Sequence, residues 1–398
     1  MNITRTPARQ LQTLQCLRLL SPRPHLSLPS RHYSSSDGSS QVDFEAIRAE
    51  MLARKPQMIW DVMSPTNTTL LNIALADFIP ISCQPAFYRA GGKYINYIKQ
   101  NSWLPQGHHF VYFPLQKTAS KLCPDGTDPY HSPGGPFVRR MWAGGSLEFK
   151  DRFRLTSSPV VCREIIEDVS IKGPEGQEKI FVDVKREYRK DHDLYKTALK
   201  DLPMQQGIAE RRTLVFMRGL SKEQARENLA ISTQGRERIV KAPHAPDFSI
   251  TLTPTPALLF HYSALSFNAH SIHLDPEFCR EVEGHRHLLV HGPLSLTLML
   301  SVLRSRFRPS EKVWKIDYRN LAAIYVNEPM RVCVRLVGNE DEIVEGKTRK
   351  WEVWVEGPDG GLSVRGTAIS LKENTKEEKQ KKEGEKKKQE EEKKEAEA

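Results

Sequence analysis

The sequence predicts an α+β fold in which an antiparallel sheet wraps around one buried helix, with this arrangement present twice. The stretch H-L-L-V-H-G-P-L-S-L-T-L-M-L-S-V-L at 287–303 has almost no polar face after Pro293, so the helix that it predicts must be enclosed by other elements. Four later segments alternate apolar and polar residues at period two, with turn signals between them. These segments, at 313–318, 330–337, 350–356 and 362–371, predict an antiparallel meander around the helix.

The first half of the chain repeats this order more weakly. The stretch W-L-P-Q-G-H-H-F-V-Y-F at 103–113 has the pattern of a second buried helix, opened by Pro and Gly. Strands are expected around 145–154, 159–171, 179–188 and 211–218, and short amphipathic helices over 44–64 and 68–79. A helical insertion is expected at 221–231, where the sequence has a Ser-x-x-Gln capping pattern. We therefore expect a first unit at 44–231, a polar link at 232–247 and a second unit at 248–371.

The N-terminal 33 residues have the composition of a mitochondrial transit peptide. They hold five arginines, no acidic residue and spaced leucines, and the serine-rich segment R-H-Y-S-S-S follows at 31–36. This pattern predicts import into the mitochondrial matrix and a mature chain that begins near Ser34. The alternative is a disordered basic tail without a targeting role.

The C-terminal residues 372–398 hold ten lysines and ten glutamates, which predicts a mostly disordered tail. Of the formal net charge of +10, the leader supplies half and the tail none, so the folded part is only mildly basic. That charge does not suggest a nucleic-acid partner. The six cysteines are scattered without a C-x-x-C pair, which indicates a reducing compartment, and no apolar run is long enough to predict a membrane span.

Three motifs carry a family resemblance that extends over roughly 60–370. They are R-R-M-W-A-G-G-S-L-E-F at 139–149, F-N-A-H-S-I-H-L-D-P-E-F at 267–278 and V-H-G-P-L at 290–294. The last two resemble the hydratase-2 motif of MaoC-like hot-dog enzymes. Together the three are more closely similar to the mitochondrial 3-hydroxyacyl-thioester dehydratase type 2 group, whose pattern bacterial mesaconyl-CoA hydratase-like proteins share. The resemblance implies a double hot-dog fold and the reversible loss of water from a (3R)-hydroxyacyl thioester.

The same resemblance implies the site residues. His273 matches the family's histidine, and the backbone N–H of Gly292, where the buried helix begins, matches the group that binds the thioester oxygen. Such chemistry needs a proton-transfer group near C2 and donors for the enolate oxygen, which a helix N-terminus can supply. The family's usual acid is replaced: an ungapped alignment puts Asn268 in its place, and a gapped one Ser266. We therefore expect His270 to share the acid/base work, or the enzyme to rely on one histidine. Asp275 is expected to cap the next short helix.

Other chemistries fit the sequence less well. Zinc could in principle be held by a group of five histidines, namely His270, His273, His285, His287 and His291. There is no neighbouring Cys pair and no H-E-x-x-H pattern, so we expect no metal. A nucleophilic serine lacks its G-x-S-x-G turn, and no phosphate-binding glycine motif is present, so we expect no cofactor. Arg139, Arg140 and Trp142 are interpreted as fold elements, and His285 and His291 as structural or pocket-lining residues.

Three functions remain open at this point. The first is a dehydratase of 3-hydroxyacyl chains on acyl carrier protein in mitochondrial fatty-acid synthesis, and the second is a hydratase of CoA thioesters such as mesaconyl-CoA. The third is a non-catalytic protein that binds acyl thioesters or acts as a scaffold. Arg304, Arg306 and Arg308 are candidates for docking an acidic carrier protein, or else complement the dipole at a helix end. The sequence leaves open whether the chain forms a homodimer.

Overall fold

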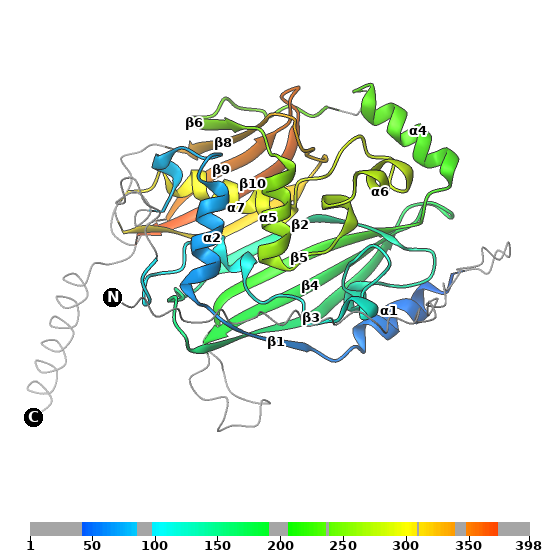
Figure 1. Cartoon of the computed structure of the whole chain (residues 1–398), viewed down its shortest axis with the longest axis horizontal. Helices are drawn as coiled ribbons and strands as arrows, with labels where there is room; N and C mark the ends of the chain where they lie inside the picture. Colours follow the sequence, from blue (N-terminus) through cyan, green and yellow to red (C-terminus); the bar gives the residue numbers. More distant parts are fainter. Residues whose placement is uncertain are drawn as a thin grey trace, which may run out of the picture. The chain divides into compact units, whose positions relative to one another are not determined.

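One antiparallel sheet of ten strands organises the described part of the chain, in the order β1-β3-β4-β5-β2-β7-β10-β9-β8-β6 (Figure 1). The computed structural model describes residues 42–85, 98–190, 206–235, 239–308, 310–338 and 348–372. The predicted transit peptide and the Lys/Glu tail from residue 373 onward therefore lie outside the described residues. The strands are β1 (Gln57–Val62), β2 (Arg139–Phe149), β3 (Pro159–Lys172), β4 (Lys179–Lys190), β5 (Gln206–Met217), β6 (Phe248–Leu252), β7 (Glu311–Asn320), β8 (Met330–Val337), β9 (Thr348–Glu356) and β10 (Leu362–Lys372).

The described α-helices are short, with lengths from six to thirteen residues. The α-helices are α1 (Phe44–Leu52), α2 (Pro65–Leu75), α4 (Lys222–Thr233), α5 (Pro256–Ser266), α6 (Pro276–Glu281) and α7 (Gly292–Arg304). The 3₁₀ turns are η1 (Ile81–Cys83), η2 (His108–Val111), η3 (Ala119–Lys121), η4 (Pro129–His131) and η5 (Ser271–His273). None of the helices in these ranges is long and apolar enough to cross a membrane.

The two halves of the sheet have the same topology. From one edge inward the strands of the first half are ordered β1-β3-β4-β5-β2. From the other edge inward those of the second half are ordered β6-β8-β9-β10-β7, which is the same pattern. A helix of eleven residues with Pro at its start follows the first strand of each half, α2 after β1 and α5 after β6. The halves join through their equivalent strands β2 and β7. This duplication is the α+β double hot-dog arrangement that the sequence and its family resemblance predicted.

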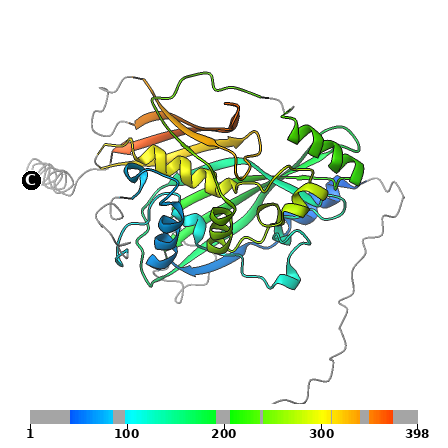
Figure 2. The same ribbon diagram turned by 45° about the horizontal axis from the view of Figure 1, so that its top comes forward.

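Helix α7 is the central element of the second half. All ten residues from Leu294 to Leu303 are buried, as its nearly all-apolar sequence requires. It packs against β7, β8 and β9, and Figure 2 shows it lying along the strands of the second half. Burying a leucine side chain typically stabilises a fold by about 1.5–3 kcal/mol, so this helix contributes a large part of the core.

The glycines of the R-R-M-W-A-G-G-S motif explain how β2 fits between two neighbours. A side chain at Gly144 would place its Cβ 2.6 Å from the carbonyl oxygen of Tyr318 in β7, and one at Gly145 would place it 2.0 Å from that of Arg211 in β5. Only glycine permits such approach of neighbouring backbones. The whole motif is strand, since β2 begins at Arg139 rather than near residue 145.

Two predicted helices are wrong. In place of a buried helix over 103–113 the structure has only the 3₁₀ turn η2, because Gly107 adopts a left-handed φ of 97° and the following residues are aromatic or β-branched. The predicted helix at 44–64 ends at Leu52, beyond which Pro56 interrupts it. Residues 57–62, Q-M-I-W-D-V, form β1 and pair with β3. The capping box at 221–224 is confirmed, since Ser221 and Gln224 bond each other's backbone N–H.

Candidate active site

A cavity of about 210 Å³ brings together four residues that the sequence singled out. Asn268, His270 and His273 reach it from the loop after α5, and Gly292 reaches it from the first residue of α7. The first half of the chain contributes His131 of η4 and residues of three strands, and further residues of the second half complete the lining. The strand residues are Arg140, Met141 and Trp142 of β2, Val184 of β4, and Arg212 and Leu214 of β5. The cavity is therefore built from both halves.

The loop that carries the histidines is held by local hydrogen bonds at both ends. Helix α5 ends at Ser266, and the left-handed φ of 52° at Phe267, its C-cap, turns the chain. The N–H of Asn268 donates to the Ser263 carbonyl over 2.9 Å. At the far end Asp275 caps α6 by accepting from the N–H groups of Glu277 and Phe278, which confirms its predicted role. The loop between these two points is short and is anchored by hydrogen bonds at both ends.

His273 has a defined tautomer. Its Nδ1 lies 2.7 Å from the carbonyl oxygen of Leu289, and a carbonyl can only accept, so Nδ1–H donates this bond. When the ring is neutral, Nε2 therefore carries a lone pair. Burial lowers the pKa of His273 to about 4 and outweighs the Leu289 bond that raises it, and the charge on Arg140 lowers it further. His273 is thus a neutral imidazole at pH 7 that can accept a proton at Nε2.

Three imidazoles lie together at this point. The rings of His273 and His291 are stacked with centroids 3.7 Å apart, and the ring of His270 meets His273 edge-on at 5.5 Å. Burial lowers the pKa values of His270 and His291 well below the usual value, and His273 lowers both further. Arg140 adds to the lowering of the His270 pKa, and His270 to that of the His291 pKa. His291 caps α7 in sequence and contacts the Ser263 hydroxyl through Nε2 at 2.8 Å. It does not line the cavity, and its ring packs against that of His273.

Gly292 presents the start of a buried helix to the cavity. It is the first residue of α7, so its backbone N–H is one of those without an acceptor inside the helix, and the helix dipole adds partial positive charge there. A Cβ at this position would lie 3.1 Å from the indole ring of Trp142, which is therefore packed against the helix start. Asn320 holds the backbone of Trp142 by donating from Nδ2 to its carbonyl over 2.6 Å.

His270 and Asn268 also have identifiable contacts. The Oδ1 of Asn268 accepts from the N–H of His270 over 3.1 Å. Asn268 lines the cavity, and its amide N–H₂ is the donor group of this side chain. The Nε2 of His270 lies 3.4 Å from Oδ2 of Asp125, a residue of the first half. Sequence reasoning did not find Asp125, because nothing in its own segment C-P-D-G-T relates it to a loop so distant in the chain.

The three predicted docking arginines lie away from this cavity. Gly292 and Arg304 are the first and last of the thirteen residues of α7, so they lie about 18 Å apart along the helix. Arg304 and Arg308 line a different, larger cavity of about 850 Å³, and Arg306 stacks over the ring of Phe248 at 4.9 Å. Arg304 donates to the Leu300 carbonyl at the end of its own helix, as expected for a residue that complements the dipole. The structure therefore does not bring these arginines together with the histidines.

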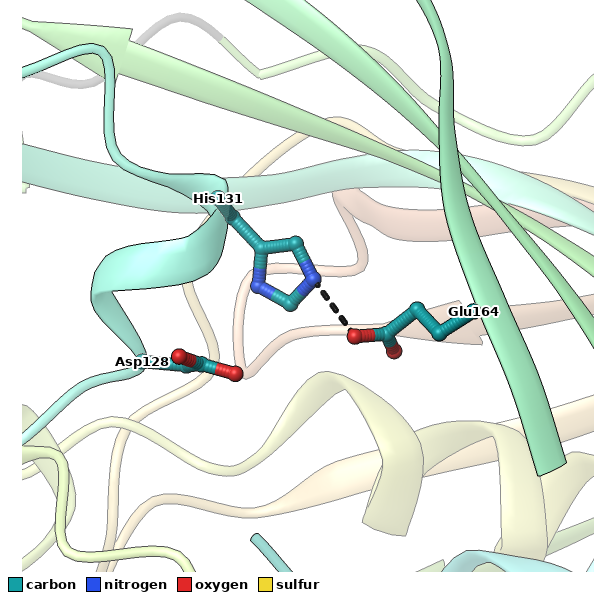
Figure 3. Close-up of side chains that lie close together, drawn as sticks. All are labelled: Asp128, His131 and Glu164. Atoms are coloured by element: carbon teal, nitrogen blue, oxygen red, sulfur yellow. Dashed lines mark hydrogen bonds and ion pairs between the residues drawn. The ribbon is translucent and has the colours of Figure 1, made fainter. Parts of the chain in front are cut away.

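A buried His/carboxylate group adjoins the cavity through His131 (Figure 3). The ring of His131 points at Glu164, with Nε2 and Oε1 3.0 Å apart, and the carboxylate of Asp128 lies nearby. Donor atoms in this arrangement suit a metal ion in principle. However, Arg186 already forms an ion pair with Glu164 at 2.9 Å, and Lys117 forms one with Asp128 at 2.9 Å. These cations neutralise the carboxylates, so we assign the group a structural role.

Sequence reasoning underestimated two residues of the R-R-M-W motif. Arg140 and Trp142, interpreted as fold elements, both line the cavity. Arg139 does serve the fold, through an ion pair with Glu283 at 2.7 Å. The available signal was the motif itself, since both residues belong to the stretch at 139–149 that carries the family resemblance.

The chain is similar to proteins of known families over most of its described length. The family described as hydroxyacyl-thioester dehydratase type 2 matches residues 107–326, more than half of the 398 residues. A mitochondrial hydroxyacyl-thioester dehydratase type 2 from Schizosaccharomyces pombe is 29% identical over 293 residues, which cover 70% of this chain and 90% of the relative. A mesaconyl-C(4)-CoA hydratase from Chloroflexus aurantiacus is 26% identical over 272 residues, 67% of this chain and 84% of that protein.

A solved structure supports the fold. The MaoC-like dehydratase from Phytophthora capsici superposes with a TM-score of 0.53 at 12% identity, covering 82% of this chain and 99% of that one. The shared architecture spans both halves of the sheet.

Proposed function

Because the chain belongs to the hydroxyacyl-thioester dehydratase type 2 family, we propose that it removes water reversibly from (3R)-hydroxyacyl chains carried by acyl carrier protein in the mitochondrial matrix. At a coarser level the family gives the activity directly: the protein is a hydro-lyase that acts on acyl thioesters. The dehydrated product is a trans-2-enoyl thioester. The observation that carries the proposal is the tautomer of His273. Its Nδ1–H donates to Leu289, so Nε2 can accept a proton, and His273 lines the same cavity as Gly292 at the start of α7.

In the proposed mechanism the start of α7 holds the thioester. The carbonyl oxygen accepts from the N–H of Gly292, where the helix dipole stabilises the negative charge that develops on it. Trp142 packs against the glycine and so sets how closely the thioester can approach. The amide N–H₂ of Asn268 orients the 3-hydroxyl group.

His273 carries the proton in both directions. Its Nε2 takes the proton from C2, and the electrons of the C2–H bond pass into an enolate. When the enolate collapses, the C2–C3 double bond forms and the C3–O bond breaks, with its electron pair leaving on the hydroxyl oxygen. The proton on Nε2 then passes to that oxygen, which departs as water and leaves His273 neutral. Atoms and protons balance with a single histidine, and hydration is the same path reversed.

The carrier and the compartment are the finer parts of the proposal. The relative from S. pombe is named as mitochondrial, which agrees with the arginine-rich leader, whereas the relative from C. aurantiacus is named for a CoA substrate. A purified-protein assay with one (3R)-hydroxyacyl chain, presented on acyl carrier protein and on CoA, tests the carrier. We expect a higher kcat/KM on the carrier protein. A preference for CoA would replace this part of the proposal with a CoA hydratase.

The leader provides a separate test of the compartment. We expect the mature protein to begin near Ser34, because the acid-free, arginine-rich segment ends at R-H-Y-S-S. N-terminal sequencing of the protein from isolated mitochondria measures this directly. An intact Met1 on the major species would contradict import by cleavage of this segment.

A further inference from the structure

A carboxylate from the first half of the chain reaches the histidine loop of the second half. Asp125 lies before η4, and its Oδ2 is 3.4 Å from Nε2 of His270. Both side chains are buried: 10% of the Asp125 side chain and 9% of the His270 side chain are exposed. His270 lines the cavity and Asp125 does not, so the carboxylate contacts the ring from outside the cavity lining.

The backbone around Asp125 is locked onto the same loop. The carbonyl of Asp125 accepts from the N–H of Ser271 over 2.9 Å. The next residue, Gly126, has φ +83°, and a Cβ there would lie 2.1 Å from the carbonyl oxygen of Ala269. Such close approach of two loops requires glycine. The position of Asp125 relative to His270 is therefore determined by backbone contacts on both sides.

The carboxylate is also oriented. Its Oδ1 accepts from the N–H of Thr127 at 3.0 Å and from the Thr127 hydroxyl at 2.5 Å. These two donors occupy one oxygen and turn the other, Oδ2, toward His270. The 3.4 Å separation is an ion-pair contact, and a carboxylate can only accept from a ring N–H, never donate to the ring.

We propose that Asp125 is a positioning residue that supplies the carboxylate missing from the histidine loop: it holds His270 in the tautomer with its proton on Nε2. The Nδ1 of His270 then has a lone pair that can accept a hydrogen bond. In dehydration its donor is the 3-hydroxyl group that His273 protonates, and in hydration it is the water that His273 deprotonates. A carboxylate that sets the tautomer of a catalytic imidazole is a well-established arrangement in enzymes. The inference deepens the proposed function and rests on it, since it assigns roles within the same site.

The neutral state of His270 makes its tautomer decisive. Burial keeps the pKa of His270 well below its usual value, with His273 and then Arg140 lowering it further, so the ring carries a single proton at pH 7. A neutral imidazole has one donor and one acceptor nitrogen. Which nitrogen faces the substrate as the acceptor is therefore decided by the partner on the other side, and that partner is Asp125.

The Asp125→Asn variant tests this with little disturbance of the loop. The amide oxygen of the new side chain can replace Oδ1 and accept from both Thr127 donors. The amide N–H₂ would then face Nε2 of His270 and require a lone pair there. We expect ¹⁵N NMR of histidine-labelled protein to show His270 with Nε2–H in the wild type and with Nδ1–H in Asp125→Asn. The His270→Gln variant assigns the signal.

Kinetics of the same variants separate positioning from a general structural effect. We expect Asp125→Asn to lower kcat about 10–100-fold, the range typical of groups that orient a functional histidine, while KM is unchanged. In the His270→Gln background the Asp125→Asn change should have no additional effect, because the carboxylate acts only through that ring. Asp128→Asn is the matched control: Asp128 is buried in the same loop, caps Tyr130 and binds Lys117, and should leave kcat unchanged.

Two results would overturn the inference. One is Nδ1–H on His270 in the wild type, and the other is an Asp125→Asn loss that is equally large in the His270→Gln background. Failure of the proposed function is a different observation, namely that wild-type protein converts no hydroxyacyl or enoyl thioester. The NMR measurement needs no substrate, so it decides the role of Asp125 toward His270 in either case.

Discussion

Each of the three clustered histidines has one ring nitrogen engaged by the protein. Nδ1 of His273 donates to Leu289, Nε2 of His291 contacts Ser263, and Nε2 of His270 faces Asp125. Only His270 and His273 line the cavity, so only these two can use their second nitrogen on a substrate. A cluster that looks like a metal site in sequence is thus a set of oriented, neutral bases.

The Asn268→Asp variant tests the role of the loop's missing acid. The new carboxylate can accept from the N–H of His270 as the Asn268 oxygen does, so we expect the loop to keep its shape. A nearby negative charge favours the protonated form of a histidine and would raise the pKa of His273 toward neutrality. We therefore expect Asn268→Asp to retain or increase activity in a steady-state assay. The Asn268→Ala variant should lose less activity than His273→Ala, because it removes an orienting group and not a proton-transfer group. A folded but inactive Asn268→Asp protein would contradict the ungapped alignment.

The sequence predicted the histidine loop at the level of single residues but not its partners. Asn268, His270, His273 and Gly292 do line one cavity, because they lie close together in the chain and a local motif describes them. Arg140, Trp142 and Asp125 come from strands and loops of the other half, and only the tertiary fold shows that they face this motif.

Among the elements, α7 was predictable and its first-half counterpart was not. An apolar run of helical length has one stable solution, which is burial. The segment at 103–113 has a similar apolar content, but Pro105 and the left-handed Gly107 interrupt it before a helix can grow. The first half therefore has no helix over 103–113 that could offer an N-terminus to a thioester, and the helix start at the candidate site comes from the second half.

The arginines proposed for docking a carrier protein lie at the C-terminal end of α7 and just after it, and their role can be tested. Arg306 and Arg308 are exposed, whereas Arg304 is tied to its own helix. If the exposed pair steers an acidic carrier, replacing both with Glu should reduce kcat/KM on carrier-protein substrates much more than on CoA substrates, most clearly at low salt. An equal loss of kcat/KM on carrier-protein and CoA substrates would contradict a docking role and assign the pair to the helix dipole or to the fold alone.

For the whole molecule, the duplicated sheet explains why one site needs both halves. The joined strands β2 and β7 place the first-half residues Arg140 and Trp142 beside the start of α7. Period-two alternation predicted most of the strands, and the repeat was visible in their order. The connection of the halves into one sheet was not visible, since a strand's sequence does not show which edge it pairs with.

The buried histidines predict a stability that depends on pH. Burial lowers the pKa of His273 and His285 to about 4 and that of His109 to about 3. Unfolded histidines have a pKa near 6.5, so between pH 6.5 and 4 the unfolded chain binds protons that the folded chain does not. The free energy of unfolding should therefore fall as the pH drops through this window, by about 1–2 kcal/mol per fully buried ring at pH 5. Urea unfolding at pH 7, 6 and 5 measures it, and an unchanged or higher midpoint at pH 5 would be inconsistent with neutral buried rings.

The most direct test of the account is the His273→Ala variant, assayed for interconversion of a (3R)-hydroxyacyl thioester and its trans-2-enoyl product. His273 packs against His291 in a loop that is fastened at both ends, so we expect the variant to keep the circular dichroism spectrum of the wild type. Losing one positioned proton-transfer group typically lowers the rate about 10²–10⁴-fold, and we expect kcat to fall within that range. A folded His273→Ala protein with wild-type activity would contradict the proposal that this loop performs the chemistry.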